Sequence, residues 1–431
     1  MKNISFSKSS LPLIGSYDVV VLGGGPAGVC AAIEAARSGA KVLLAEATGG
    51  LGGMATSALV GPFMTSYDRD GERPVVGGLF TEIVERLSER GGAIVPSDTD
   101  SPSVYTSFIK KYHRHVTPID SFELEVLLDE MTREAGVEVM LYTRFADAIT
   151  EGEEIKVAVL LALEGLVGVE AKVFIDCTGN ADVANAAGVP TYKGHEESGI
   201  PQPATLMFEV SGADDERYEN YAARPEYPVK VYRTPEAGTY KVNHYHVFGA
   251  DATSSESMTR AHMQARTQVK DAFSVLKNKT PGFENAIIKK VAPSLGVRES
   301  RHIVGKYKIT VGDVSRGTKF DDRISAYGFG MDVHNRTEKE SGNFKTEVAP
   351  VYYVPYRSLL PLGCDNLLVA GKTVSCESQA AGGLRCMPSA MAMGQAAGLA
   401  AALAVKGGTR VEKIDITELQ NELRSRGAIL D

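Results

Sequence analysis

The chain has 431 residues, of which 43% are hydrophobic and 23% are charged. This composition is typical of a globular protein and excludes a disordered or fibrous one, and the length predicts two or three domains. The formal net charge is −8 and the sequence contains no dense cluster of lysine and arginine, so nucleic acid is not expected as a partner.

The first predicted element is a buried strand that ends in a glycine-rich turn. Residues 17–25 read YDVVVLGGG, and their continuous apolar run is typical of a parallel strand buried on both faces. The following PAGVCAAIEAARSG predicts an alanine-rich helix that stops at Gly39, and KVLLAE predicts a second buried strand. Together these segments predict one βαβ unit.

The turn of this unit carries a dinucleotide-binding fingerprint. Residues 23–28 satisfy GxGxxG between a predicted strand and a predicted helix. We expect Gly23 to make the tight turn, Gly25 to let a pyrophosphate approach the backbone, and Gly28 to allow close helix packing. Glu46 ends the second strand, where an acid binds ribose hydroxyls. The alternative is a glycine-rich turn followed by a solvated glutamate.

A second glycine-rich loop follows Glu46 directly. Its sequence is ATGGLGGMATSA, with Gly49, Gly50, Gly52 and Gly53. Such a loop suits close backbone contact with an elongated cofactor and favours FAD over NAD. A flexible surface loop is the alternative, since glycine alone also marks turns.

The predicted secondary structure changes twice after this loop. Residues 137–171 are short β-prone pieces that predict an antiparallel meander, and residues 172–176 predict another buried strand. Residues 201–349 mix polar and aromatic segments with a long helix over 258–276. The segment NLLVAG at 366–371 again predicts a Rossmann-like strand, and a helix is expected to begin near Pro388.

These elements predict an α/β fold with a Rossmann-like FAD/NAD(P)-binding domain that is split in the sequence. The expected limits are residues 1–200 for its first part and 350–431 for its C-terminal part. Residues 201–349 are expected to form an inserted α+β domain that holds the substrate.

Five blocks of the sequence resemble a family of FAD-dependent oxidoreductases that carries a GGMAT-type loop. This family is part of the glutathione-reductase-type superfamily, which also contains fumarate reductase flavoproteins. The resemblance covers most of the chain and implies non-covalent FAD, because the loop reads GGMATSA where some relatives carry a linking histidine. The blocks are IGSYDVVVLGGGPAG, LLAEATGGLGGMATSA, FIDCTGNADVANAAG, LGVRESRHIVGKY and LLVAGKTVSCESQAAGGLRCMPSAMAMGQAAG.

The resemblance also implies which residues contact FAD. Those of the fingerprint and the ribose strand are Gly23, Gly25, Pro26, Ala27, Gly28, Glu46 and Ala47. Those of the second loop, expected near the ribityl chain and the isoalloxazine ring, are Gly52, Gly53, Met54, Ala55 and Thr56. Phe145 and Ala146 are expected at the adenine, and the remaining contacts are Thr178, Gly179, Asp182, Gly371, Arg385, Met387 and Pro388.

The block that contains GGLRCMPSAMAMGQAAG also predicts a role at the cofactor from physical arguments alone. Gly382 and Gly383 precede Pro388, a residue suited to a first helical turn, so a helix N-terminus is expected to face the cofactor. The helix dipole and Arg385 would stabilise the negative charge of reduced flavin and raise its potential. The alternative is that Arg385 is a solvated or ion-paired surface residue.

The segment LGVRESRHIVGKY, which otherwise reads as a strand, carries candidate catalytic residues. Arg298 and Arg301 could grip an anionic substrate, and His302 could move a proton. A structural ion-pair network among Arg298, Glu299 and Arg301 is equally consistent with the sequence.

The histidines and cysteines predict no metal site. His244 and His246 would share one face of a strand, but no third ligand accompanies them, so ordinary histidines are the better interpretation. The five cysteines are odd in number and contain no CxxC pair, which favours a reduced, cytoplasmic protein. Residues 390–405 come closest to a membrane span, but they are short and interrupted by Gln395, and they predict a buried helix.

The sequence therefore predicts a cytoplasmic FAD-dependent oxidoreductase that transfers hydride between a small substrate and flavin N5, and the two arginines would suit an anionic substrate. The alternative function is a flavin-bearing electron-transfer subunit of a larger complex. No membrane span is expected.

Overall fold

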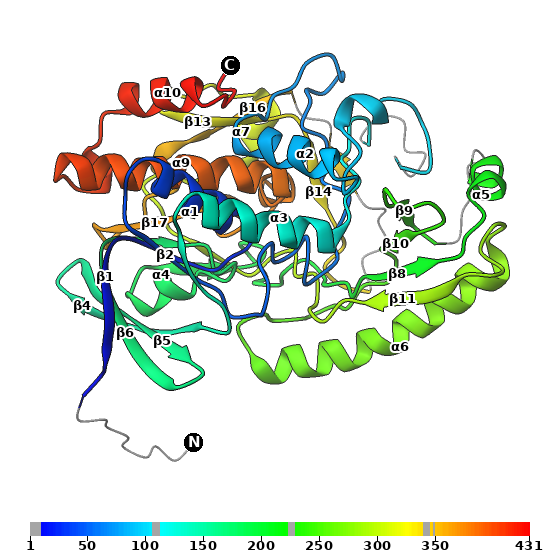
Figure 1. The fold of residues 1–431 in the computed structure, drawn as a ribbon, viewed down its shortest axis with the longest axis horizontal. Helices are drawn as coiled ribbons and strands as arrows, with labels where there is room; N and C mark the ends of the chain where they lie inside the picture. The colour runs from blue at the N-terminus through cyan, green and yellow to red at the C-terminus, as the bar shows by residue number, and fades with distance from the viewer. Residues whose placement is uncertain (1–9, 106–112, 223–228, 339–344, 348–349) are drawn as a thin grey trace.

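The computed structural model describes residues 10–105, 113–222, 229–338, 345–347 and 350–431. Its largest sheet has seven strands and lies at the left in Figure 1, and the four-stranded sheet lies at the right. The strand order of the large sheet is β3–β2–β1–β6–β5–β4, and β17 also pairs with β6. The strands are β1 (Leu13–Leu22), β2 (Val42–Ala45), β3 (Glu138–Met140), β4 (Arg144–Glu151), β5 (Glu154–Ala162), β6 (Gly165–Asp176) and β17 (Leu367–Val369). Strands β1, β2, β3, β6 and β17 pair with one another in parallel. Strand β5 pairs antiparallel with both β4 and β6.

The apolar run of β1 explains its central place. Val19 and Val21 face one core, and Val20 and Leu22 face another on the opposite side of the sheet. Side chains alternate across a strand, so an unbroken apolar run is stable only where both faces are covered. The chain continues into α1 (Pro26–Arg37) and β2, and the predicted βαβ unit is confirmed.

The long strand β6 joins two pairing patterns. Its first part pairs antiparallel with β5, and its end at 174–176 pairs parallel with β17. The separate strand predicted at 172–176 is therefore the end of β6. The predicted meander is correct for β4 to β6 but wrong for β3, which pairs parallel with β2 because Glu138–Met140 aligns with Leu43–Ala45.

Helix α9 (Met387–Gly407) lies against α1 through small residues. A Cβ atom on Gly394 would stand 2.1 Å from the Ala27 carbonyl oxygen, and one on Gly398 would stand 2.2 Å from that of Ala31. By length and composition α9 could cross a membrane, but 83% of its most apolar window is buried inside the protein. The predicted buried helix is thus present. The same side of the sheet carries α2 (Leu79–Glu89), α3 (Ser121–Glu134) and α10 (Ile416–Ser425) (Figure 1).

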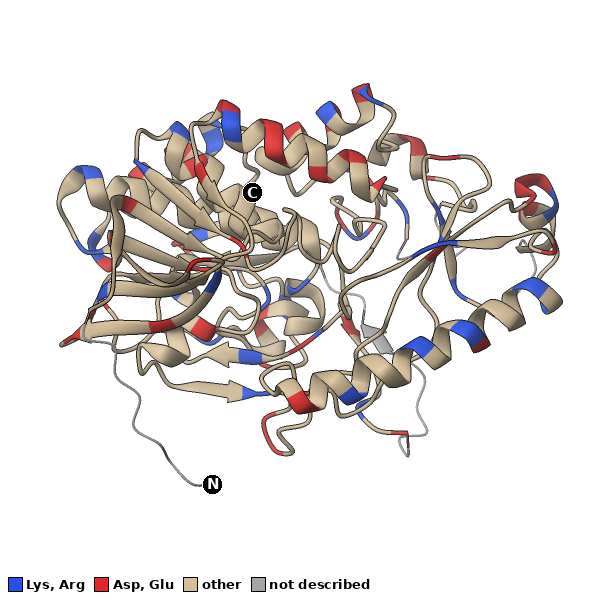
Figure 2. Ribbon diagram, turned by 60° about the horizontal axis from the view of Figure 1, so that its bottom comes forward, with Lys and Arg blue, Asp and Glu red and all other residues tan. Residues whose placement is uncertain are grey.

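A four-stranded antiparallel sheet packs on a long helix in the second part of the molecule. Its order is β11–β8–β10–β9, and its core includes Phe208, Tyr240 and Phe283 with Ala265 and Leu276 of the helix. The predicted helix is present as α6 (Ser255–Lys279), capped by the Ser254 side chain. The strands are β8 (Phe208–Ser211), β9 (Val231–Arg233), β10 (Tyr240–Val242) and β11 (Ile287–Val291), and α5 (Asp215–Ala222) precedes β9. The outer helices carry charges of both signs (Figure 2).

The remaining elements are short and connect the two sheets. Ile309, Val314 and Ile324 pack in the core of the large sheet, although they fall within the predicted insertion of 201–349, whose limits stay a prediction. Three two-stranded pairs are β7–β12, β13–β16 and β14–β15. The bounds are α4 (Asp182–Ala186), β7 (Thr191–Lys193), β12 (Arg301–Ile303), α7 (Val311–Arg316), β13 (Arg323–Tyr327), β14 (Met331–Val333), β15 (Lys345–Glu347), β16 (Tyr352–Pro355) and α8 (Ala381–Leu384).

Candidate functional site

A cavity of about 340 Å³ lies between the large sheet and the four-stranded sheet. Four residues that line it directly follow the carboxyl ends of parallel strands. They are Gly23 after β1, Glu46 after β2, Cys177 after β6 and Ala370 after β17. Ligands of open α/β sheets bind at this edge, where strand order reverses. The first residues of α1 and α9 also border the cavity, so two helix N-termini face it.

The three fingerprint glycines differ in what surrounds them. Gly23 has φ +102°, and a Cβ atom there would lie 2.4 Å from the Cys177 carbonyl oxygen. A Cβ atom on Gly28 would lie 1.8 Å from the Gly23 oxygen. No atom of the described residues lies within 4 Å of a Cβ atom on Gly25, which lines the cavity. Gly23 and Gly28 therefore serve chain packing, and Gly25 keeps space open.

Glu46 is fixed at the cavity by three hydrogen bonds. Its carboxylate accepts the Gly24 N–H at 2.7 Å, the Thr48 N–H at 2.7 Å and the Thr48 hydroxyl at 2.8 Å. The second glycine loop touches the first, since a Cβ atom on Gly53 would lie 2.9 Å from the Gly25 Cα. The two loops predicted from the sequence thus form one continuous wall.

The structure brings most of the predicted FAD contacts to this cavity. Those that line it are Gly23, Gly25, Pro26, Ala27, Glu46, Gly53, Met54, Thr178, Gly179, Gly371, Arg385 and Met387. Those that do not border it are Gly28, Ala47, Gly52, Ala55, Thr56, Phe145, Ala146, Asp182 and Pro388. Their contacts with FAD stay predictions.

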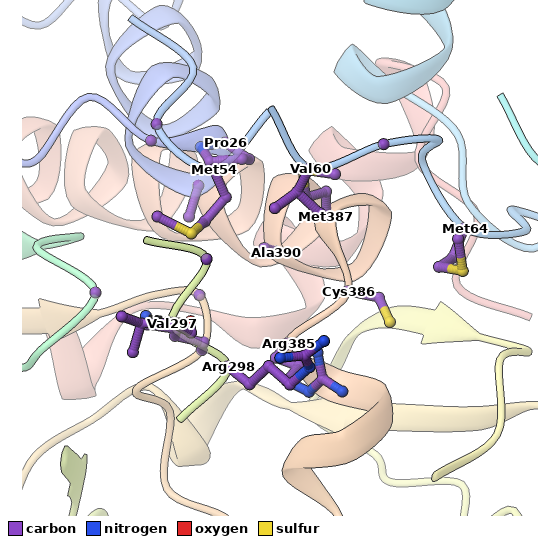
Figure 3. Close-up of a pocket in the computed structure, with 18 of the residues that line it drawn as sticks. Pro26, Met54, Val60, Met64, Val297, Arg298, Arg385, Cys386, Met387 and Ala390 are labelled. Atoms are coloured by element: carbon purple, nitrogen blue, oxygen red, sulfur yellow. Dashed lines mark hydrogen bonds between the residues drawn. The ribbon is translucent and has the colours of Figure 1, made fainter. Parts of the chain in front are cut away.

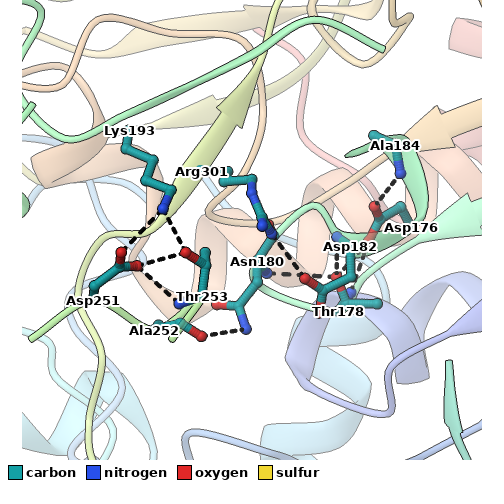
Figure 4. A network of polar contacts seen from close by, with 10 residues as sticks. All are labelled: Asp176, Thr178, Asn180, Asp182, Ala184, Lys193, Asp251, Ala252, Thr253 and Arg301. Carbon is teal, nitrogen blue, oxygen red and sulfur yellow. Dashed lines mark hydrogen bonds and ion pairs between the residues drawn. The ribbon is translucent and has the colours of Figure 1, made fainter. Parts of the chain in front are cut away.

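Asp182 and Arg301 belong to a polar network beside the cavity (Figure 4). The Arg301 guanidinium donates to Asp182 Oδ1 at 3.0 Å and to the Asn180 carbonyl at 3.2 Å. Asp176 holds the same turn by accepting the N–H groups of Thr178 and Ala184, both at 3.0 Å. Arg301 therefore has a structural partner and does not line the cavity.

His302 is buried in a second network and does not reach the cavity. Its Nδ1 lies 3.1 Å from the Val374 carbonyl oxygen, and its Nε2 lies 3.6 Å from Glu299. Burial opposes its charge, but Cys376 and Glu299 raise its pKa to about 10. Glu299 accepts from Arg336 at 2.6 Å, so the ion pair expected of it with Arg298 or Arg301 is instead made with Arg336.

Arg298 and Arg385 are the two predicted catalytic residues that line the cavity, and Figure 3 shows their side chains pointing into the same region. Arg298 donates to the Pro203 carbonyl at 2.7 Å and to the Thr205 hydroxyl at 2.8 Å. Arg385 donates to Asp332 Oδ2 at 2.9 Å, and its buried Nε has no hydrogen-bond partner among the described residues. Burial and the nearby Arg385 lower the pKa of Arg298 to about 9.

Lys372 adds a third cation to the cavity and was missed from the sequence. Its Nζ donates to the Val297 carbonyl at 2.9 Å, and burial followed by Arg385 lowers its pKa to about 8. It directly follows Gly371 at the end of a predicted strand, which is the signal that could have identified it. With Lys230, four basic side chains of the described residues line this cavity, and they favour a negatively charged occupant.

Other cavity residues come from segments with no recognisable pattern. They reach the site only through packing of the two sheets, so periodicity could not identify them. These are His113, Thr205, Met207, Lys230, Tyr232, Asn243, Phe329, Asp332 and His334.

The described residues place neither the cysteines nor His244 and His246 in a group of three side chains that could hold a metal ion. All five cysteines are buried and free, and burial raises the pKa of Cys386, which caps α9, to about 12. His244 and His246 follow the end of β10 at Val242, so the strand expected around them is absent and they do not share a strand face. Within the described ranges, no three His, Cys, Asp or Glu residues are placed to hold a metal ion.

The donors around the cavity fit FAD. Gly25 leaves open space beside the α1 N-terminus for a pyrophosphate, and the fixed Glu46 carboxylate suits ribose hydroxyls. At the other end, the α9 N-terminus and Arg385, whose Nε is unsatisfied, suit a group that becomes negatively charged.

Comparison with known proteins supports this fit. The sequence matches the family model "FAD dependent oxidoreductase" over residues 18–423. An uncharacterised protein from the nifH2 5' region of Methanosarcina barkeri is 29% identical over 188 residues, which are 42% of this chain and 94% of that protein.

Solved structures of two other proteins resemble this chain at low identity. p-Nitrophenol 4-monooxygenase PnpA from Pseudomonas putida DLL-E4 has a TM-score of 0.50 and 12% identity, covering 95% of this chain and 83% of that chain. A geranylgeranyl bacteriochlorophyll reductase-like protein from Thermoplasma acidophilum has a TM-score of 0.49 and 15% identity, covering 96% and 84%. At 12% identity, the likeness to p-nitrophenol 4-monooxygenase bears on the fold and not on the substrate.

Proposed function

Because the chain belongs to the FAD-dependent oxidoreductase family and its cofactor is FAD, we propose that it transfers hydride between a small anionic substrate and flavin N5. The observation that carries this proposal is the pair of partly buried guanidinium groups, Arg298 and Arg385, which line one cavity with Lys372.

The fingerprint end of the cavity would hold the nucleotide half of FAD. The α1 N-terminus with Gly25 would bind the pyrophosphate, and Glu46 would bind a ribose. Met54 and the α9 N-terminus would border the flavin, and Arg385 would favour its reduced anionic form. FAD supplies the site that accepts or gives hydride, and the protein supplies orientation and charge.

The end of the cavity formed by the four-stranded sheet would hold the substrate. Met207 and Tyr232 offer apolar surface, and Asn243 and Thr205 offer polar contacts. Arg298 is already hydrogen-bonded to Pro203 and Thr205, which fixes its guanidinium for an incoming anion. We infer that the substrate carries a carboxylate or a comparable anionic group.

A cytoplasmic location and non-covalent attachment of FAD are part of the same proposal. The support for the location is that the five cysteines are free. The support for non-covalent binding is that the loop at 49–58 contains neither His nor Cys, and that the thiol of Cys386 is buried with a raised pKa.

The test is anaerobic bleaching of the bound flavin by a panel of small carboxylic acids that carry oxidisable hydroxyl or amino groups. We expect Arg298→Ala to raise KM by about 10- to 100-fold, the effect of about 1.5–3 kcal/mol for a charge-assisted contact. Arg301→Ala is the matched comparison, since its guanidinium lies on Asp182 outside the cavity. Equal KM values for Arg298→Ala and wild type would refute the anion site.

A further inference from the structure

Lys241 is a buried lysine of β10 that the function proposed above does not use. Its neighbours Tyr240 and Val242 face the core that the four-stranded sheet forms with α6. Side chains alternate across a strand, so Lys241 projects from the opposite face of the sheet. Only 2% of Lys241 is exposed. Lysine is almost never buried to this extent unless its charge has specific partners, so its contacts indicate its role.

Two hydrogen bonds link Lys241 to the second glycine loop. The Lys241 ammonium donates to the Ser121 hydroxyl at 2.7 Å, and that hydroxyl donates its own proton to the Ala55 carbonyl at 2.7 Å. Ser121 is the first residue of α3 and is 3% exposed, and hydrogen bonds shielded from water in this way are stronger. Strand β10 is therefore joined to the loop through the start of α3.

The ammonium lies directly behind the cavity wall. A Cβ atom on Gly61 would stand 3.0 Å from Lys241 Nζ, and Gly61 itself lines the cavity. The Val60 N–H donates to the Met54 carbonyl at 2.8 Å, which holds these two parts of the loop together. Their side chains border the cavity (Figure 3), at the wall where the proposed function places the flavin. The residues of this loop that line the cavity are Gly53, Met54, Ser57, Val60 and Gly61.

Groups from each neighbouring element influence the charge of Lys241. Glu209 of β8 and Tyr232 of β9 pair directly with it across the sheet, and Glu209 Oε1 lies 3.9 Å from Nζ. Lys290 of β11 pairs with Glu209, and Asp120 precedes α3. Burial lowers the pKa of Lys241 to about 8, with Lys290 adding to the effect and Glu209 and Asp120 opposing it. The side chain is therefore mainly charged at pH 7 and becomes neutral at alkaline pH.

We propose that Lys241 is a positioning residue for the flavin, which holds the loop 53–61 at the cavity through Ser121 and places a positive charge behind the ring. A positive charge shielded from water favours the reduced, negatively charged flavin over the neutral oxidised one. Fixing the loop favours FAD binding in both redox states, whereas the charge favours the reduced state alone. This inference rests on the placement of the flavin in the proposed function and does not depend on the substrate.

The test uses the full chain with FAD and needs no substrate. FAD titration of the apoprotein gives Kd, and anaerobic titration with dithionite beside a reference dye gives the midpoint potential. We expect Lys241→Met to raise the Kd of FAD by about 10-fold, the effect of losing one hydrogen bond from a charged group. The binding of reduced relative to oxidised flavin should weaken by about another 10-fold, which lowers the potential by about 30 mV.

The pH dependence of the potential separates the effect of the charge from a merely structural effect. Above about pH 8 the wild-type potential should fall more steeply with pH than that of Lys241→Met. The reason is that reduction of the flavin raises the pKa of Lys241 and is accompanied by proton uptake there. Lys289→Met is the matched control, because Lys289 is exposed on β11 and pairs with Glu236, and it should leave both Kd and the potential unchanged.

A folded Lys241→Met protein with the wild-type potential between pH 7 and 9 overturns the proposal. If Lys241→Met does not fold, Ser121→Ala tests the positioning role, since it removes the link to Ala55 and leaves the charge in place. Ser121→Ala should raise the Kd of FAD by about 10-fold, and a wild-type Kd overturns the proposal.

These measurements are independent of the test of the proposed function. If Lys241→Met behaves as wild type, hydride transfer to or from an anionic substrate still stands, because Arg298→Ala tests it separately. If no compound bleaches the flavin, the proposed hydride transfer fails, while the potential and the Kd of FAD still decide the role of Lys241.

Discussion

Gly25 and Gly28 belong to one turn, yet a side chain would have a different effect at each. A Cβ atom on Gly28 meets the Gly23 carbonyl oxygen at 1.8 Å, whereas one on Gly25 meets nothing within 4 Å and enters the cavity. Gly25 has φ −72°, which any residue adopts. We therefore expect Gly25→Val to fold but to lose FAD, measured by circular dichroism and flavin fluorescence titration.

The contrasting variant at this turn is Gly28→Ala, which should lower stability because the clash is with backbone. If Gly25→Val binds FAD with wild-type affinity, then Gly25 does not border the cofactor.

Lys372 predicts a pH dependence of stability in the apoprotein. Burial and Arg385 lower its native pKa to about 8, whereas an exposed lysine titrates near 10.5. Between these pH values the unfolded state binds more protons, so the contribution of Lys372 to the free energy of unfolding rises with pH. Below about pH 8 Lys372 is charged in both states, so the full cost of burying its charge lowers the free energy of unfolding.

We expect Lys372→Met to be more stable than wild type at pH 7, and this advantage to shrink by pH 9.5. The shift is on the order of 1–3 kcal/mol, since one pKa unit corresponds to about 1.4 kcal/mol. Urea denaturation of both apoproteins at several pH values measures it. A difference that is constant with pH would show that Lys372 keeps an ordinary pKa.

At the scale of elements, α1 and α9 pack against each other beside the cavity that we propose holds FAD. Gly394 lies against the Ala27 backbone, and Ala27 lines the cavity. Gln395 of the same helix donates to the buried Glu34 of α1 at 2.8 Å, which fixes the helices in register. A change in their separation therefore moves the α1 N-terminus.

Gly394→Ala should destabilise the protein by about 1–3 kcal/mol, the range for overpacking, and should weaken FAD binding. Gly407→Ala is the matched control in the same helix, because its new methyl group meets only the end of the Thr409 side chain. Thermal denaturation and FAD titration of the two variants compare them. Equal effects of both substitutions would contradict the importance of close helix contact.

At the scale of the whole molecule, segments far apart in the sequence share one cavity. The wall residues come from both glycine loops, from 177–179, from the four-stranded sheet and from 370–390. A ligand that bridges these segments binds the native state alone and stabilises it by mass action.

We expect added FAD to raise the melting temperature of the apoprotein in a concentration-dependent way. A free concentration of 100 times Kd corresponds to about 2.7 kcal/mol. Acid precipitation should release the flavin into the supernatant if attachment is non-covalent. Gly25→Val is the control that should show no shift, and flavin retained in the acid pellet would refute non-covalent binding.

The sequence by itself determined the local units and the cofactor. The βαβ unit, the glycine fingerprint with Glu46, and the helix begun by Met387 and Pro388 depend on short-range patterns, and the structure contains each of them. Backbone conformation and strand burial are dictated within a few residues, which is why these features could be predicted.

Only the tertiary structure decided which polar residues meet in the cavity. Arg298, Arg301 and His302 lie within five residues of each other, yet Arg298 faces the cavity, Arg301 faces Asp182, and His302 is buried against Glu299. Asp332 and His334 come to the site from one segment at β14, and Lys230 comes from another, next to β9. Their positions depend on how the two sheets pack, a long-range property that no local pattern encodes.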